Sequence, residues 1–322
     1  MQIDEYEFEY VDIDSVEHIG YFEEEYVYDI EVSDNDKRTF FANDILVHNS
    51  IFLCFDEIYN LIDFEDDIIE FVKKLNELFL EEFFVKILDL YSKKFNTDNH
   101  QLFELEKLAR KAIFLGKKRY VLDLAWTMTG VSYKEGEKLT IKGVEIIRSD
   151  TPKFCKKHLK NMVNYILKES DNLDIENLVR MIKQLKKEYL LTDIEELSYG
   201  KSVNNYDKFV LDDRKTLKLA KGTPINVSSS GVYNFLLNKN KKLKNKYHLI
   251  KSGDKIRYYY IKNNPNYNSF AFIPGEFPVE FAPDFDYDLM FVKTFIHPLN
   301  SFVEAILKRS IPDNLTIQKK LF

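Results

Sequence analysis

The sequence predicts a multi-domain protein with a short all-β segment, then an α+β region and then a mainly α region. Residues 1–49 alternate apolar and polar side chains in short runs separated by turn residues, which is typical of β-strands. Residues 50–150 combine strand-like runs with one long helical pattern, and residues 153–192 have the apolar spacing of two amphipathic helices.

The first 49 residues form the β segment. The strands that we expect there are Tyr6–Val11, Tyr26–Val32, Phe40–Phe41 and Ile45–Val47. A β segment of this size is too small to bury a core by itself, so we expect it to be incomplete without another polypeptide.

Net charge divides the chain at the same place. Residues 1–49 contain 15 acidic residues against Lys37 and Arg38, a formal charge of −13, whereas the remaining 273 residues carry 38 acids and 44 bases, or +6. Such a break is typical of two unrelated modules joined in one chain. Within the basic part, residues 212–262 hold thirteen bases and three acids.

The longer part of the chain begins with an apolar strand, Ile51–Phe55, followed by helical spacing over Asp66–Phe95. Further strands are expected at Leu102–Glu106 and Lys118–Leu124, and helices at Lys153–Glu169 and Asp174–Leu190. The two cysteines, Cys54 and Cys155, suggest no disulfide framework, and no uncharged apolar run is long enough for a membrane span. We therefore expect a cytoplasmic protein without a membrane partner.

The runs Val27–Glu31 and Phe40–Ser50 together resemble the two final sequence blocks of an intein. The resemblance implies the C-terminal half of a split intein of the Hint type, residues 1–49, which splices at Asn49 and Ser50. Asn49 would cyclise on its own carbonyl, His48 would polarise that peptide bond, and Ser50 would carry the acyl group. Asp29 matches a block position. Arg38 stands where many inteins have a second His. Because Arg cannot act as a general base, either His48 carries more of the proton transfer or Arg38 stabilises developing oxyanion charge.

The residues after Asn49 resemble the C-terminal part of a family B DNA polymerase, most closely the replicative polymerase of T-even-like phages. The motifs that carry the resemblance are, in order, Ser50–Leu53, Gly116–Tyr120, Lys142–Glu145, Ser149–Lys153 and Lys293–Leu299. It implies the rest of the palm at 50–150, the thumb at 151–309 and a tail at 310–322. Gln318, Leu321 and Phe322 in this tail resemble a sliding-clamp-binding motif.

The resemblance also implies a division of the catalytic site. Ser50 matches the last residue of the family's Asp-Thr-Asp-Ser motif, so the metal-binding Asp residues would lie on an N-terminal fragment that carries the other intein half. Mg²⁺ or Mn²⁺ and dNTPs would act only after joining. Glu104 and Glu106 match supporting palm acids, although the family has Asp at the place of Glu104. Glu106 is the better candidate for a supporting carboxylate, and the alternative is that both are ordinary solvated acids on a strand.

Primer-template DNA is the remaining partner that the resemblance implies. The residues expected to contact it are Lys117, Lys118, Arg119, Tyr120, Ser149, Thr151, Lys153, Ser228, Ser229 and Ser230. The sequence thus favours the precursor of a polymerase fragment that is ligated by trans-splicing. Two alternatives stay open: a non-catalytic DNA-binding or clamp-recruiting subunit that assembles without ligation, and a self-cleaving module of the Hedgehog-like class.

Overall fold

The computed structural model describes residues 40–42, 45–47, 68–94, 96–99, 104–211, 216–240 and 242–316. The chain divides into two compact units, which are treated separately below: unit 1 comprises Met1–Asp63 and Glu77–Glu104, and unit 2 comprises Phe64–Asn76 and Leu105–Phe322. Several predicted site residues lie outside the described residues, namely Asp29, Arg38, His48, Asn49, Ser50, Gln318, Leu321 and Phe322.

Unit 1 contains a small antiparallel hairpin, which confirms the last two strands predicted for the β segment. Strand β1 (Phe40–Ala42) pairs with β2 (Ile45–Val47), with Phe40 opposite Val47. A two-stranded hairpin is marginally stable alone. Helix α3 (Glu81–Lys94) lies in the same unit, and among its residues only Ser92 is buried. Large apolar side chains are exposed here: Leu78, Phe79, Phe83, Val85, Ile87 and Leu90.

The long helix predicted over Asp66–Phe95 is observed in three pieces. Helix α2 (Ile68–Leu75) is followed by a π-helical turn at Asn76–Leu80 and then by α3. Helix α2 belongs to unit 2, where Ile69 and Val72 are buried. The amphipathic pattern therefore identified the helix correctly, but it gave no sign of the interruption.

The first sheet of unit 2 is antiparallel and has the order β3-β4-β5. It consists of β3 (Lys107–Gly116), β4 (Arg119–Thr127) and β5 (Leu139–Lys142). The central strand β4 buries a continuous run, Val121–Ala125. The predicted strand Leu102–Glu106 is wrong, because residues 104–106 have no regular structure and the strand starts at Lys107. The strand predicted at Lys118–Leu124 is observed as β4, which starts one residue later than predicted, at Arg119.

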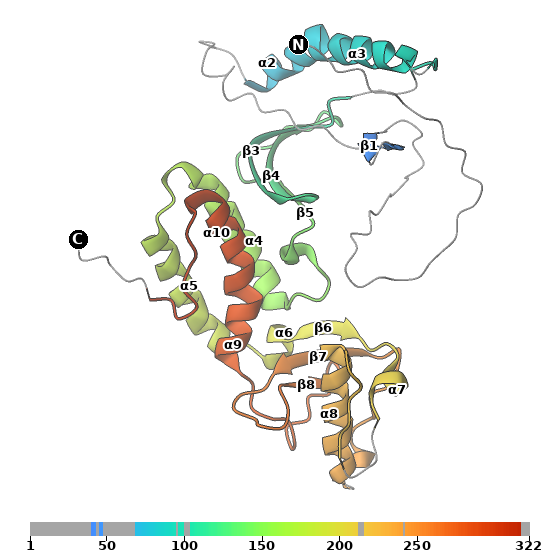
Figure 1. Cartoon of the computed structure of the whole chain (residues 1–322). Helices are drawn as coiled ribbons and strands as arrows, with labels where there is room; N and C mark the ends of the chain where they lie inside the picture. Colours follow the sequence, from blue (N-terminus) through green and yellow to red (C-terminus); the bar gives the residue numbers. More distant parts are fainter. Residues whose placement is uncertain are drawn as a thin grey trace. The chain divides into compact units, whose positions relative to one another are not determined.

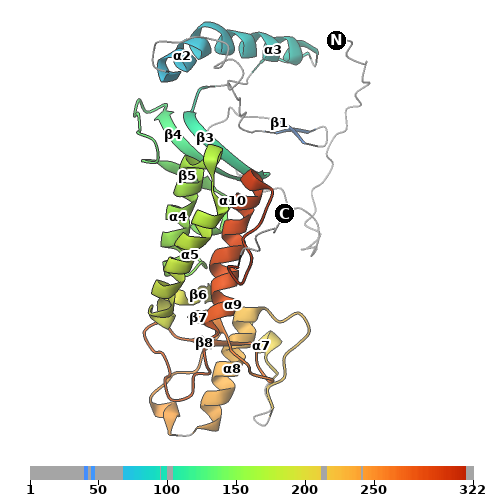
Figure 2. The same ribbon diagram turned by 90° about the vertical axis from the view of Figure 1, so that its left-hand side faces the viewer.

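Three helices of unit 2 lie side by side in both views (Figures 1 and 2): α4 (Lys153–Lys168), α5 (Ile175–Leu190) and α10 (His297–Leu307). Helices α4 and α5 confirm the two predicted helices almost to the residue. The Asp174 carboxylate caps α5 by accepting hydrogen bonds from the backbone N–H groups of Glu176 and Asn177. A short helix, α9 (Tyr287–Phe291), and a π-helical turn at Val292–Ile296 lead into α10.

A second antiparallel sheet shows that the mainly α prediction for residues 151–309 was incomplete. Its order is β6-β7-β8, with β6 (Tyr199–Ser202), β7 (Lys255–Tyr260) and β8 (Ser269–Phe272). Helix α8 (Ile225–Lys239) packs on this sheet, and the short helices α6 (Ile194–Leu197) and α7 (Tyr206–Phe209) flank it (Figure 1). Its core is aromatic, with Tyr233, Tyr259, Phe270 and Phe272 fully buried.

No helix in the described part of the chain is long and apolar enough to cross a lipid bilayer.

Candidate nucleic-acid interface

A tight basic turn joins β3 to β4. Gly116 pairs with Arg119, which leaves Lys117 and Lys118 as the two residues of the turn. Lys118 adopts a left-handed backbone conformation with φ of 58°. The side chains of Lys117, Lys118 and Arg119 are exposed, whereas Tyr120 is partly buried and its ring lies 5.9 Å from that of Phe114. The structure therefore places three neighbouring cationic side chains on the surface of one hairpin.

The end of β5 lies against this turn. Tyr120 is paired with Lys142, and the next residue, Gly143, has φ of +61°. A Cβ atom at Gly143 would be 2.2 Å from the carbonyl oxygen of Lys118. The close approach requires glycine on steric and conformational grounds. It also brings the exposed Lys142 beside the basic turn, a neighbour that the strand register reveals and the linear sequence does not.

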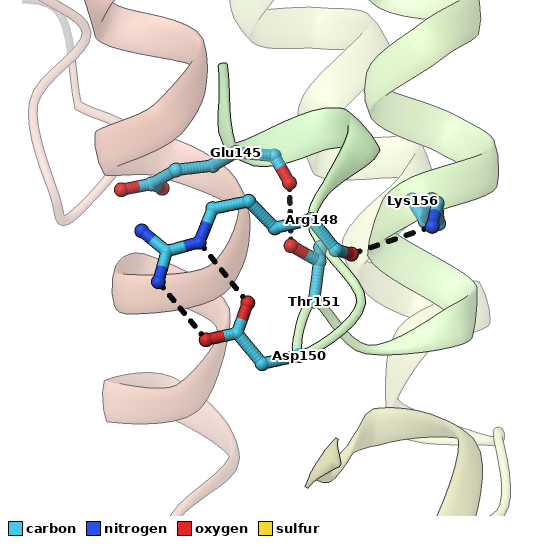
Figure 3. Close-up of polar contacts among 5 residues, drawn as sticks. All are labelled: Glu145, Arg148, Asp150, Thr151 and Lys156. Atoms are coloured by element: carbon cyan, nitrogen blue, oxygen red, sulfur yellow. Dashed lines mark hydrogen bonds and ion pairs between the residues drawn. The ribbon is translucent and has the colours of Figure 1, made fainter. Parts of the chain in front are cut away.

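The segment between β5 and α4 is fixed by buried anchors and polar contacts (Figure 3). Val144 and Ile146 are each 2% exposed and anchor a 3₁₀ turn at Glu145–Ile147. The Thr151 hydroxyl donates to the carbonyl oxygen of Glu145 at 2.5 Å, and Lys156 Nζ lies 3.3 Å from the carbonyl oxygen of Arg148. The predicted contact Thr151 is thus partly used within the protein, whereas Ser149 and Lys153 are exposed.

Helix α4 continues the basic surface from this segment. Its apolar face is buried through Phe154, Cys155 and Leu159. The opposite, solvent-exposed face carries Lys153, Lys156, Lys157 and Lys160. This spacing places the four ammonium groups on one side of the helix, and no acidic residue occurs between Lys153 and Lys168. Among these lysines the sequence had indicated only Lys153. The 3.6-residue period of the buried positions was the signal for the others.

Two of the predicted DNA contacts need correction. Ser229 and Ser230 lie inside α8 and are fully buried. The Ser229 hydroxyl contacts the carbonyl oxygen of Ile225 and the hydroxyl of Ser269, and the Ser230 hydroxyl donates to the carbonyl oxygen of Asn226. Neither hydroxyl is accessible to a phosphate. Ser228 is partly exposed and stays a predicted contact.

The basic segment at residues 212–262 contributes exposed lysines around the second sheet, including Lys218, Lys221 and Lys255. The aromatic residues interleaved with them serve mainly as core, because Tyr233, Phe235, Tyr247, Tyr258 and Tyr259 are buried. Burial raises the pKa of the Tyr258 and Tyr259 hydroxyls well above the usual range. These tyrosines are therefore neutral, and most of the segment's aromatic rings are not available for base stacking.

The two predicted palm carboxylates, Glu104 and Glu106, shortly precede strand β3 in the sequence. Glu106 is half-exposed and forms an ion pair with Lys107 at 2.5 Å, while Glu104 is exposed at the end of unit 1. In the described residues no three His, Cys, Asp or Glu side chains lie close enough together to hold a metal ion.

Comparison with known proteins shows the family of this chain. The sequence profile of DNA polymerase family B matches residues 80–306. The chain belongs to the family B DNA polymerases. It is 33% identical over 181 residues to a DNA polymerase of Thermococcus sp. (strain GE8), covering 56% of this chain and 9% of that protein. It is also 32% identical over 179 residues to a DNA polymerase of Thermococcus litoralis, covering 55% and 8%.

The chain thus spans less than a tenth of the length of these curated relatives. The family B match includes the basic turn, Gly143, the segment before α4 and the second sheet. Sequence reasoning placed Lys142 and Gly143 in a motif of the resemblance but gave them no role at the site. It missed Arg148 and the lysines of α4 after Lys153, which strand register, backbone conformation and burial bring to notice.

Proposed function

We propose that this chain is the precursor of the C-terminal fragment of a replicative DNA-directed DNA polymerase, joined to an N-terminal fragment by intein trans-splicing at Asn49 and Ser50. The family B match over residues 80–306 carries the polymerase part of this proposal. The fragment would contribute the remaining palm at residues 50–150, the thumb at 151–309 and the tail at 310–322. The phage-like type stays part of the proposal.

The basic surface supports a role in holding primer-template DNA. Lys117, Lys118, Arg119 and Lys142 are exposed at one end of the first sheet, and the lysine face of α4 follows in the same unit. Such side chains contact phosphates without demanding a base sequence, and they provide affinity that falls with salt. A polymerase needs sequence-independent binding of this kind.

Exposed apolar side chains among the described helical residues of unit 1 favour a partner polypeptide. The described β1–β2 pair, with three residues in each strand, is also too small to be stable by itself. The splicing residues themselves, His48, Asn49 and Ser50, support the proposal by their chemistry alone. The partner would carry the other intein half and the metal-binding Asp residues. Glu106 would then be a supporting acid, and Mg²⁺ or Mn²⁺ and dNTPs would bind to the joined enzyme.

A sliding-clamp partner and a cellular location also belong to the proposal. Gln318, Leu321 and Phe322 would engage a sliding clamp after joining. The site of action would be the cytoplasm, which is the host cytoplasm if a phage encodes the chain.

One experiment tests the splicing. The full chain is mixed with a partner that ends in the complementary intein half after an Asp-Thr-Asp sequence, and the products are weighed by mass spectrometry. We expect a ligated product that is absent with Asn49→Ala and present with Asn161→Ala, an exposed position on α4. Primer extension should accompany the ligated product. Extension by unligated chains would instead favour the non-covalent subunit alternative, and the same ligation by Asn49→Ala would refute the splicing chemistry.

A further inference from the structure

In the segment between the first sheet and α4, Arg148 and Asp150 form an ion pair through two hydrogen bonds. Arg148 Nε donates to Asp150 Oδ1 and Arg148 Nη2 donates to Asp150 Oδ2, both at 3.1 Å. The two parallel bonds fix the plane of the guanidinium group (Figure 3). The side chain of Arg148 is nevertheless 59% exposed, whereas that of Asp150 is 23% exposed. The pair therefore holds a cationic group in a defined orientation at the surface.

The backbone beneath this pair is also fixed. Val144 and Ile146 are buried, and the Thr151 hydroxyl bonds to the carbonyl oxygen of Glu145. On the other side, the backbone N–H of Gly200 in β6 donates to the carbonyl oxygen of Asp150 at 3.2 Å. Asp150 is thus tied to the second sheet through its backbone while its carboxylate orients Arg148. A long side chain loses less entropy on binding a ligand when it is already held in this way.

The guanidinium group keeps a donor edge that Asp150 does not use. Of its five N–H donors, Asp150 takes the one on Nε and one on Nη2. Figure 3 shows the third nitrogen, Nη1, turned away from Asp150. Within the residues that the structure describes, no hydrogen bond occupies the edge formed by Nη1 and Nη2. Two parallel donors at this spacing match two oxygens of a phosphate group.

We propose that Arg148 binds a backbone phosphate of duplex DNA through its Nη1–Nη2 edge, and that Asp150 is the positioning residue that presents this edge. The inference rests on the proposed DNA-binding function, which it extends to a residue pair outside the predicted contacts. Lys142, Lys153 and Lys156 surround the pair in sequence and are exposed, so the local balance of charge favours an anion despite Glu145 and Asp150.

The variant Asp150→Asn separates a positioning role of Asp150 from an effect of net charge, because the two predict opposite changes in DNA affinity. Asp150→Asn removes a negative charge, so a surface that binds DNA only by net charge would bind more tightly. If Asp150 positions Arg148, the same variant binds about threefold more weakly, because the freed side chain must be ordered on binding. Glu145→Gln is the charge-matched control: it removes an exposed negative charge nearby and leaves the Arg148–Asp150 pair intact, so its affinity should stay the same or increase.

The experiment measures binding of the full 322-residue chain to a fluorescent primer-template duplex across a series of salt concentrations. We expect Arg148→Ala to weaken binding roughly tenfold at low salt and to reduce the slope of log K against log salt by about 0.9, the value for one lost phosphate contact. Arg148→Lys should keep the slope and bind about threefold more weakly, because an ammonium group cannot form both paired interactions. Thermal unfolding of each variant shows that it is folded.

Three results would overturn the inference alone while leaving the DNA-binding proposal in place. They are an unchanged slope with Arg148→Ala, tighter binding with Asp150→Asn, and equal weakening with Asp150→Asn and Glu145→Gln. A wild-type chain that shows no salt-dependent binding to the duplex would overturn both this inference and the proposed DNA contact.

Discussion

Replacing Gly143 with alanine tests whether the close packing of β5 on the basic turn positions the DNA contacts. Gly143 has φ of +61°, and its Cβ would meet the carbonyl oxygen of Lys118 at 2.2 Å and Arg119 Cγ at 3.1 Å. Gly130, in the turn after β4, is a matched control. It has φ of +81°, and a Cβ there would meet no atom within 4 Å.

Both substitutions force a non-glycine residue into a left-handed backbone conformation, and only Gly143→Ala also creates a steric contact. A left-handed backbone conformation costs a non-glycine residue about 1 kcal/mol, which applies to both positions. At Gly143 the contact must also open from 2.2 Å to beyond 3.0 Å, so the Lys118 turn has to move away from β5. Displacements of packed backbone of this kind cost roughly 2 kcal/mol more. Gly143→Ala should therefore lower the melting temperature of unit 2 by about 4–8 °C more than Gly130→Ala does.

Thermal unfolding and duplex binding are measured on the same preparations. Movement of the turn displaces Lys117, Lys118 and Arg119 together, so Gly143→Ala should bind the duplex at least about fivefold more weakly and with a shallower salt slope. Gly130→Ala should bind like the wild type. Equal losses of melting temperature in the two variants, together with unchanged affinity for Gly143→Ala, would refute the reasoning that this contact positions the turn.

Three further predictions concern stability and reactivity. Ser229→Ala leaves the buried Ser269 hydroxyl without its hydrogen-bond partner, so the free energy of unfolding should fall by about 1–3 kcal/mol. The slope of log K against log salt for DNA binding should not change. A changed slope would restore Ser229 as a DNA contact. Burial raises the pKa of Cys155 to about 12, so an alkylating reagent should leave its thiol unmodified at pH 8 in the native protein and modify it in denaturant. Mass spectrometry of the Cys155 peptide measures both. Rapid alkylation of the native protein would contradict the burial of Cys155. Hydrogen bonds from Lys246 and Tyr247 lower the pKa of Glu280 from 4.5 to about 2, so its contribution to stability is complete above about pH 4.5 and is lost as the pH falls toward 2. The melting temperature of the wild type should therefore fall over this pH range more than that of Glu280→Gln. An equal fall in both proteins would argue against the interaction.

Local patterns sufficed to predict some elements of the fold. Helices α4 and α5 have a clear apolar stripe, and the N-cap Asp174 marks where the second one begins. The hairpin at residues 40–47 has short apolar strands that pair in register. These elements could be predicted because each one carries its whole signal within its own residues.

The errors arose where the signal depends on tertiary packing. Residues 102–106 alternate like a strand, whereas the actual strand β3 is irregular, with three shifts in its register against β4. Helix α8 is buried on nearly all sides, so it lacks the amphipathic stripe, and its run of serines resembles a loop. Strands β6 and β8 have only four residues each, too few to establish a period.

The candidate site shows the same division between local and tertiary information. The basic turn was predicted from its motif, because its three cations are adjacent in sequence. Lys142 and Gly143 stood in a separate motif, and only the pairing of Lys142 with Tyr120 and the approach of Gly143 to Lys118 show that they lie beside the turn. Arg148 and Asp150 are two residues apart, a spacing that predicts nothing until the segment between the first sheet and α4 is folded.

The proposal assigns DNA binding and catalysis to different parts of the enzyme. The basic turn, Gly143, the Arg148–Asp150 pair and the lysine face of α4 all belong to unit 2, which has its own continuous core. In the proposed enzyme unit 2 would therefore hold the duplex, and the N-terminal fragment would supply the metal-binding Asp residues for nucleotide addition. The unspliced chain should accordingly bind a primer-template duplex with salt-dependent affinity and extend no primer. Joining would supply the missing carboxylates to a DNA-holding surface that is already formed.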